Sequence, residues 1–330
     1  MDVAPPGHSG FIGSHVTEPI LEPAAQQLAD ATAGFPPLSE LGYPAARKVL
    51  DDIQAGPVQK LPVDEEWVAV AAAGDVRVRI IRPQGAEGSL PVILYLHGGG
   101  WVLGNAGTHD RLVRELAVGS GAAVAFVEYS KSPEARYPVA IEQAYATAQW
   151  LVREGADRGL DGTRIAVAGD SVGGNMAAVL TLMAKDRGDV RFVQAQMYYP
   201  VTDAAMDTES YRRFADGPYI TRKTMEWFWE AYIADPAQRF EINASPNQAT
   251  VEQLRGLPPT FVLVDEADVL RDEGEAYAAK LRAAGVPVTT VRYDGICHDF
   301  MMLDPLSQTN ATRAAIAQAT ALFRNAFDSE

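Results

Sequence analysis

A serine in the segment Gly169-Asp170-Ser171-Val172-Gly173 has the surroundings that a nucleophile needs. The segment fits the G-x-S-x-G pattern and lies between the apolar run Arg164–Ala168 and a helical pattern that continues through Ala184. A serine at such a tight strand-to-helix turn needs small neighbours on both sides because the backbone there is strained. The positive end of the helix also favours a developing oxyanion. The pattern therefore predicts Ser171 as a nucleophile for acyl transfer.

A serine hydroxyl becomes a good nucleophile only when a base takes its proton, and histidine is the commonest base. His298 follows the last predicted strand, so in a parallel sheet it would lie at the same carboxyl-terminal edge as Ser171. We therefore predict His298 as the general base. The other four histidines have weaker contexts: His8 and His15 lie in an irregular N-terminal arm, His97 shapes a glycine loop, and His109 begins a helix with no motif around it.

The base needs a carboxylate that fixes its tautomer and stabilises the imidazolium. In the chain order serine, acid, histidine, this carboxylate belongs to the loop after the strand Phe261–Val264. Asp272 is placed to begin the next helix, a common role for aspartate. Asp268 lies in the middle of the loop and is the best candidate by position. Spacing leaves open the two carboxylates nearer the strand end, Asp265 and Glu266.

Three consecutive glycines follow the strand Val92–Leu96, in the segment His97-Gly98-Gly99-Gly100-Trp101. Glycines let the backbone approach a substrate closely and turn its N–H groups inward. With the N–H of Val172 they would form an oxyanion hole, in which one donor typically lowers the barrier by roughly 3–4 kcal/mol. A phosphate-binding loop is the rival interpretation, but the segment lacks the Lys-Ser/Thr of a P-loop and the second half of G-x-G-x-x-G.

Apolar strands alternate with helices through most of the chain, which predicts an α/β fold with a mainly parallel sheet of eight strands. A hairpin comes first, with Trp67–Val70 and Val76–Ile80 on either side of a Gly74-Asp75 turn. The later strands are Val92–Leu96, Ala122–Val127, Arg164–Ala168, Val193–Tyr199, Phe261–Val264 and Val288–Tyr293. Helices are expected at Asp110–Val118, Ile141–Glu154, after Ser171 through Ala184, at Asp272–Ala284 and at 308–327.

Two blocks do not fit this alternation. Residues 1–60 are helical and amphipathic, with helices expected at Ile20–Ala33 and Leu38–Ile53. Residues 205–250 contain a helix with three bulky aromatics that either face the core or form an apolar wall over a pocket: Trp227, Phe228 and Trp229. We expect the two blocks to fold together as one cap over a catalytic core of residues 61–204 and 251–330.

The composition excludes several classes of protein. The chain has 330 residues, and 28 Lys and Arg against 43 Asp and Glu give a formal charge of −15, which argues against a nucleic-acid partner. The single cysteine, Cys297, excludes an intrachain disulfide and a Cys-rich zinc site. No run approaches the roughly 18 apolar residues of a membrane span, and Met1–Pro6 lacks the features of a signal peptide. We therefore expect a cytoplasmic protein with no membrane span.

Together these motifs resemble those of the bacterial hormone-sensitive-lipase-like (family IV) esterases, a branch of the α/β-hydrolase superfamily. The resemblance covers residues 90–325 and rests on four motifs in order: His97–Trp101, Gly169–Gly174, Asp268–Gly274 and His298–Phe300. The third motif is similar to the family's D-P-L-R-D segment, whose first aspartate is the triad acid, and so implies Asp268. The family's oxyanion donors would fall on Gly99, Gly100 and Val172.

The sequence departs from the family at a few positions. Val172 stands where alanine is usual, which keeps the backbone donor and adds a bulkier side chain. The segment Glu128–Glu134 replaces Y-R-L-A-P-E, which affects a supporting surface rather than the triad. Asp299 follows the base where a small residue is usual, and it either modulates the base or faces solvent. Cys297 is expected to be a packed thiol rather than a second nucleophile.

The resemblance implies an α/β-hydrolase fold with a helical cap and a carboxylesterase that acts on short-chain esters through a Ser-His-Asp acyl-enzyme mechanism. It implies a small-molecule ester as the only ligand, no metal or organic cofactor, and a homodimer that pairs through the last strand, Val288–Tyr293. If the cap aromatics line the pocket, they predict acyl chains of roughly two to six carbons. Two alternatives stay open: an amide, lactone or carbamate hydrolase with the same triad, and a non-catalytic hydrolase-like receptor.

Overall fold

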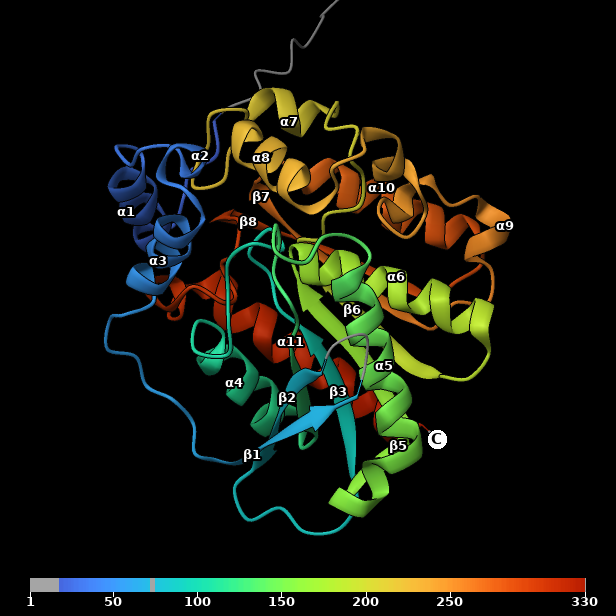
Figure 1. Ribbon diagram of the computed structural model, residues 1–330. Coiled ribbons are helices and arrows are strands. Elements are labelled where there is room, and N and C mark those ends of the chain that lie inside the picture. Colours follow the sequence, from blue (N-terminus) through green and yellow to red (C-terminus); the bar gives the residue numbers. More distant parts are fainter. Residues whose placement is uncertain (1–17, 72–74, 330) are drawn as a thin grey trace, which may run out of the picture.

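One eight-stranded sheet runs through the protein in the order β1-β2-β4-β3-β5-β6-β7-β8 (Figure 1). The computed structural model describes residues 18–71 and 75–329, so His8, His15 and Gly74 of the predicted turn lie outside the described residues. The strands are β1 (Val63–Val70), β2 (Val76–Pro83), β3 (Leu90–Leu96), β4 (Ala123–Glu128), β5 (Leu160–Asp170), β6 (Phe192–Tyr198), β7 (Thr260–Ala267) and β8 (Val288–Cys297).

Only β2 runs against the direction of the other strands. It is antiparallel to both of its neighbours, β1 and β4, whereas the five pairs from β4 to β8 are all parallel. Every residue of β6 is buried, while exposed and covered positions are mixed along β1. Strands covered on both faces read as continuous apolar runs, which is why the sequence locates the central strands well. The prediction of a mainly parallel eight-stranded sheet is confirmed.

Helices cover both faces of the sheet. On one face α4 (Asp110–Ser120) packs against α11 (Asn310–Asp328). On the other, α5 (Val139–Glu154) packs against α6 (Val172–Arg187), and α10 (Arg271–Ala283) packs on β7 (Figure 1). Short helices complete this part: α9 (Val251–Leu254) and the 3₁₀ helices η1 (Gly155–Arg158), η2 (Pro236–Phe240), η3 (Pro246–Gln248) and η4 (Asp304–Leu306).

The N-terminal block is helical, but it is broken once more than the sequence predicts. Its helices are α1 (Pro23–Thr32), α2 (Leu38–Leu41) and α3 (Tyr43–Ile53), so the prediction of a single helix over Leu38–Ile53 is wrong. Gly42 between α2 and α3 has a φ of 73°, outside the helical region. The next residue but one, Pro44, lacks an N–H and its ring would meet the carbonyl of Glu40 in a continuous helix. The chain therefore stops and restarts at Gly42.

The block before β1 lies beside the insertion after β6, on the side of the sheet where the parallel strands end (Figure 1). The insertion contributes α7 (Glu209–Arg213) and α8 (Arg222–Tyr232). Tyr43 of α3 stacks on Trp227 of α8, with ring centroids 5.2 Å apart. Both blocks therefore cover the edge at which the functional residues are expected.

Several side chains fasten the N-terminal block to the rest of the protein, among them Arg47, Gln54 and Glu22. Arg47 donates to both carboxylate oxygens of Glu134. Gln54 donates to the carbonyls of Thr108 and Met302 and accepts from the N–H of Asp304. The carboxylate of Glu22 accepts from the first two N–H groups of α11, which have no partner inside that helix. No helix within residues 18–71 and 75–329 is both long and apolar enough to cross a membrane.

Candidate active site

Ser171 occupies a strained turn between β5 and α6. Its φ of 55° and ψ of −120° are unusual for a residue with a side chain. The turn is so tight that a Cβ on Gly173 would lie 1.9 Å from the carbonyl oxygen of Leu96, and a Cβ on Gly169 would meet Gly173 at 2.4 Å. These contacts explain why G-x-S-x-G needs glycine on both sides of the nucleophile. The strain holds the Ser171 side chain at the carboxyl end of β5.

The structure brings the three predicted catalytic side chains together. Nε2 of His298 lies 3.0 Å from Oγ of Ser171, and Nδ1 of His298 lies 2.8 Å from Oδ2 of Asp268. The second oxygen of Asp268 accepts from the N–H of Leu270 at 3.0 Å. Ser171, Asp268 and His298 are all buried. A base 3.0 Å from the hydroxyl is within reach of its proton, and a carboxylate behind the base holds the ring in place.

The surroundings of His298 favour its protonated form. Burial alone would lower its pKa, but the negative charge of Asp268, that of Asp299 and the hydrogen bond to Asp268 outweigh burial and raise the pKa. An imidazole with a raised pKa binds a proton more strongly. The pair His298 and Asp268 is therefore suited to take the proton of Ser171 during attack.

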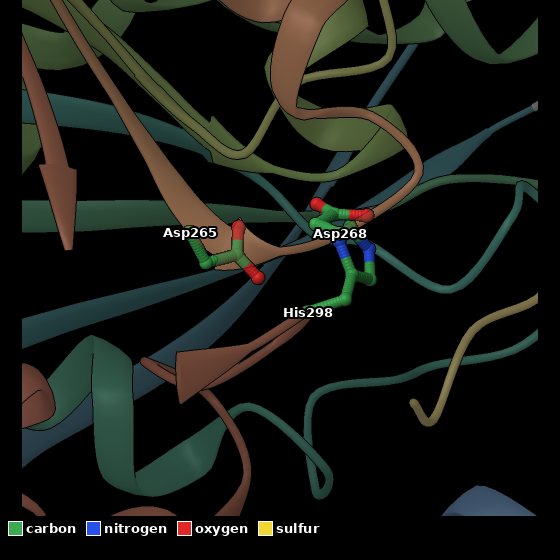
Figure 2. Close-up of side chains that lie close together, drawn as sticks. All are labelled: Asp265, Asp268 and His298. Atoms are coloured by element: carbon green, nitrogen blue, oxygen red, sulfur yellow. The ribbon is translucent and has the colours of Figure 1, made fainter. Parts of the chain in front are cut away.

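The other carboxylates of the Asp268 loop have different partners. Figure 2 shows the side chain of Asp268, and not that of Asp265, beside the imidazole of His298. Asp265 is buried with no hydrogen-bond partner for either oxygen among the described residues, and burial together with the charge of Asp268 raises its pKa. Glu266 accepts from the N–H of Gly295. Asp272 lies in the first turn of α10, and its carboxylate accepts from Ser210 and Arg271.

One group of side chains in the described part of the chain has ligand atoms close enough to share a metal ion. These are Asp265, Asp268 and His298, whose ligand atoms all lie within 4.8 Å of one another (Figure 2). In this group Nδ1 of His298 already bonds to Asp268, and Nε2 faces Ser171. Both ring nitrogens of His298 therefore already have partners, and we assign the group no metal.

The glycine loop after β3 presents unpaired N–H groups. Gly98 donates to Asp170, but the N–H groups of Gly99 and Gly100 have no acceptor among the residues that the structure describes. The N–H of Val172 is also without an intrahelical partner because Val172 is the first residue of α6. Gly99 and Gly100 have φ values of 104° and 64°, which favour glycine. The three predicted oxyanion donors are thus free to bind a ligand.

A pocket of about 340 Å³ opens above Ser171. Its floor includes Gly99, Gly100, Ser171, His298 and Asp299, and its walls come from residues 29–53 of the N-terminal block and 215–228 of the insertion after β6. Of the three aromatics of α8, only Phe228 lines the pocket, where it covers Gly100 so closely that a Cβ there would meet its ring at 2.2 Å. The idea that all three line the pocket is therefore wrong: Trp227 stacks on Tyr43, and Trp229 packs on Trp101 with centroids 4.9 Å apart.

The two residues beside His298 are both buried. Cys297 is a buried free thiol, in agreement with the prediction of a packed cysteine. Asp299 is buried with a φ of 65°, and its Oδ1 lies 3.4 Å from Nε2 of His298. Of the two interpretations left open for Asp299, exposure to solvent is wrong. The contact with His298 favours the other, that Asp299 modulates the base.

Sequence reasoning missed two residues behind the site, Asp170 and His109. Nε2 of His109 lies 3.1 Å from Oδ2 of Asp170, and both side chains are fully buried. Asp170 stands at a variable position of G-x-S-x-G, and His109 is 61 residues away from it. No short motif could join residues so far apart. The only signal was the aspartate itself, a charged residue inside a predicted buried turn.

The comparisons with known proteins agree with this geometry. A family model described as the alpha/beta hydrolase fold matches residues 93–302. The chain belongs to the α/β-hydrolase family. One relative of this α/β-hydrolase is the carboxylesterase NlhH of Mycobacterium tuberculosis, which is 35% identical over 87% of this chain and 90% of that protein. Another is the ethyl acetate hydrolase of Pseudomonas putida, which is 38% identical over 68% of this chain and 71% of that protein.

Solved structures are similar as well. A thermostable esterase from Pseudomonas putida matches with a TM-score of 0.93 and 47% identity over 95% of this chain and 100% of that one. Together, the family model, the relatives and the similar structures place this chain in the hormone-sensitive-lipase-like branch of the family.

Proposed function

We propose that this α/β-hydrolase is a carboxylesterase that hydrolyses short-chain esters through an acyl-enzyme. The observation that carries the proposal is the continuous contact from Asp268 through His298 to Ser171, at 2.8 and 3.0 Å, beside unpaired N–H groups in the same pocket. The names of the relatives, carboxylesterase and ethyl acetate hydrolase, support the same reaction class.

In the proposed mechanism Oγ of Ser171 attacks the ester carbonyl while Nε2 of His298 takes its proton. The negative oxygen of the tetrahedral intermediate accepts hydrogen bonds from Gly99, Gly100 and Val172. The intermediate then collapses, the alcohol leaves with the proton from His298, and the acyl group stays on Ser171. Water repeats the sequence: His298 takes its proton, the acid is released, and the Ser171 hydroxyl is restored.

We propose that the acyl chain is short because Phe228 closes the pocket over Gly100. In this proposal the remaining walls come from the cap predicted at 1–60 and 205–250, on a core of 61–204 and 251–330, and the contact of Tyr43 with Trp227 supports it. Residues 1–17 of that cap lie outside the described residues. A pocket of about 340 Å³ is at the small end of ligand sites. Highest activity on p-nitrophenyl palmitate rather than acetate or butyrate would contradict a short pocket.

A homodimer through Val288–Tyr293 and a cytoplasmic location stay predictions. β8 is an edge strand of the sheet, and an edge strand has unpaired backbone groups that can pair with a second copy. Light scattering of the purified protein tests the dimer. A mass of one chain at micromolar concentration would contradict it.

An organophosphate such as paraoxon tests the proposed nucleophile directly. We expect mass spectrometry to find one phosphoryl adduct on the peptide that contains Ser171, and no adduct in the Ser171→Ala variant. His298→Gln serves as the control for the base: it keeps the serine and should react far more slowly. A receptor without turnover would bind ester ligands but form no adduct. An amide, lactone or carbamate hydrolase would form the adduct but prefer its own substrate over p-nitrophenyl butyrate.

A further inference from the structure

The carboxylate of Asp170 joins the two halves of the active site from behind. Asp170 ends β5 directly before Ser171, and its side chain is fully buried. Oδ2 accepts from the N–H of Gly98 at 3.0 Å and faces Nε2 of His109 at 3.1 Å, while Oδ1 accepts from the hydroxyl of Tyr95 at 2.6 Å. Gly98 is the residue before the unpaired N–H groups of Gly99 and Gly100. One buried side chain thus connects the nucleophile turn with the glycine loop.

The backbone of Gly98 lies directly on this carboxylate. A Cβ at Gly98 would lie 2.2 Å from Oδ2 of Asp170 and 3.0 Å from its backbone oxygen. Contacts below 3.0 Å with packed atoms cannot be accommodated without moving the loop. Gly98 therefore has to be a glycine so that the backbone can lie close to Asp170, whereas Gly99 and Gly100 carry the unpaired N–H groups. The position of the loop depends on Asp170.

The contacts of His109 can be satisfied by an imidazolium. Its Nε2 faces the Asp170 carboxylate, which can only accept, so this nitrogen carries a hydrogen. Its Nδ1 lies 2.9 Å from the hydroxyl of Thr108, which lies equally close to the carbonyl of Asn105. When the hydroxyl donates to that carbonyl, Nδ1 donates to the hydroxyl and both ring nitrogens carry a hydrogen. In agreement, the charge of Asp170 and the hydrogen bond to it outweigh burial and raise the pKa of His109.

A buried anion next to the oxyanion hole would oppose the reaction if nothing offset it. The oxyanion forms beside Gly99 and Gly100, one and two residues from the amide that Asp170 holds. A negative charge inside a protein interacts over several ångströms because the interior screens charge poorly. A protonated His109 at 3.1 Å makes the pair neutral. Asp170 can then position the loop without repelling the negative charge that develops on the substrate.

We propose that Asp170 and His109 are positioning residues: Asp170 holds the Gly98–Gly100 loop against the nucleophile turn, and His109 offsets the charge of Asp170 beside the oxyanion hole. This inference rests on the proposed esterase function. Neither side chain lines the pocket, so neither is expected to contact substrate. Their loss should therefore reduce kcat for a neutral ester much more than it changes KM.

Three variants test the offset of charge. His109→Gln leaves the Asp170 carboxylate without a cation, and we expect kcat/KM for p-nitrophenyl butyrate to fall about 100-fold, the effect of losing an oxyanion-hole donor. Asp170→Asn removes the anion and should cost less. The double variant His109→Gln/Asp170→Asn should recover at least about tenfold over His109→Gln, because a neutral amide needs no counterion. A double variant as impaired as His109→Gln, or more so, would overturn the role of charge.

Two matched tyrosine variants test the positioning role without removing a charge. Tyr95 and Tyr198 are both fully buried; Tyr95 donates to Asp170, whereas Tyr198 donates to Gln196. Tyr95→Phe should lower kcat several-fold more than Tyr198→Phe, although both lose one buried hydroxyl. Affinity for a trifluoromethyl ketone, which forms an oxyanion on Ser171, should fall in proportion to kcat/KM. Equal effects of the two variants on kcat and on this affinity would overturn the positioning role.

The paraoxon adduct separates failure of this inference from failure of the proposed function. Wild-type protein without an adduct on Ser171 contradicts the esterase mechanism, and with it the inference. Wild-type protein with the adduct, together with wild-type kcat in His109→Gln and in Tyr95→Phe, contradicts the inference alone. If His109→Gln does not fold, the comparison of Tyr95→Phe with Tyr198→Phe decides.

Discussion

Oδ1 of Asp299 lies 3.4 Å from Nε2 of His298. This is the nitrogen that faces Ser171, so His298, the proposed base, contacts one carboxylate through Nδ1, that of Asp268, and a second through Nε2, that of Asp299. Oδ1 of Asp299 is buried and has no hydrogen-bond partner among the described residues. Burial raises the pKa of Asp299 to about 6, against the opposing effect of His298. Above that pH its negative charge stabilises the imidazolium.

Replacement of Asp299 by asparagine should therefore change the pH profile. Loss of the negative charge destabilises the protonated ring, so the pKa of His298 falls and the acid limb of kcat/KM moves to lower pH by about one unit. The measurement is kcat/KM for p-nitrophenyl butyrate between pH 5 and 11, because the charges of Asp268 and Asp299 outweigh burial and raise the pKa of His298 to about 10. Asp216→Asn removes an exposed carboxylate of the pocket wall and should leave the limb in place. A shift to higher pH in Asp299→Asn would contradict this role.

A methyl group on Gly100 should abolish most of the activity. Its φ of 64° is strained for any residue with a side chain, and the added Cβ would meet the ring of Phe228 at 2.2 Å. We therefore expect the loop to shift, and its N–H groups with it. We expect kcat to fall at least about 100-fold. Gly121→Ala is the matched control: its φ is 72°, but nothing lies within 4 Å of the added carbon. It should cost about 1 kcal/mol of unfolding free energy and no activity; comparable loss of kcat in both variants would contradict the prediction.

Truncation of Phe228 should lengthen the acyl chains that the enzyme accepts. Phe228→Ala opens space over Gly100, and we expect the ratio of kcat/KM for p-nitrophenyl octanoate to that for the butyrate to rise about tenfold. Trp227→Ala removes a neighbouring aromatic that stacks on Tyr43 outside the pocket wall. That variant should unfold at lower temperature with its chain-length profile unchanged. An unchanged profile in Phe228→Ala would show that another wall limits the chain.

Loss of the Gln54 side chain should loosen the cap. Gln54, the residue directly after α3, makes three hydrogen bonds to loops of the core, two of them to residues 302 and 304 beyond His298. We expect Gln54→Ala to lower the unfolding free energy by about 2–3 kcal/mol because buried partners lose their bonds. Gln26→Ala, also in the N-terminal block, removes only an exposed bond to Asp30 and should change stability by less than about 0.5 kcal/mol. Equal urea midpoints for the two variants would contradict the prediction.

The sequence was most informative where chemistry imposes a local pattern. The sharp turn at Ser171 requires glycines at fixed offsets, and the unpaired amides of the oxyanion loop require glycines after a strand. Buried parallel strands read as apolar runs, so the edge at which Ser171 and His298 meet could be inferred. The three side chains predicted for the triad lie in hydrogen-bond distance, as that inference required.

What the sequence missed depends on contacts between distant segments. Successive residues of a helix point about 100° apart, so Trp227, Phe228 and Trp229 could not all face one pocket. Which one does is decided by the packing of Trp227 on Tyr43 and Trp229 on Trp101. The contact of His109, the residue before α4, with Asp170 of β5 leaves no local trace in the sequence. The break at Gly42 was visible as Gly-x-Pro, but an amphipathic pattern on both sides concealed it.

The most direct test of the central claim is the turnover of p-nitrophenyl butyrate by Ser171→Ala. The variant removes only the hydroxyl oxygen and keeps the Cβ in the same turn, so the fold should survive and can be checked by circular dichroism. If Ser171 is the nucleophile that His298 and Asp268 activate, kcat should fall by about 10⁶-fold. Turnover at the wild-type rate by the folded variant would contradict the mechanism.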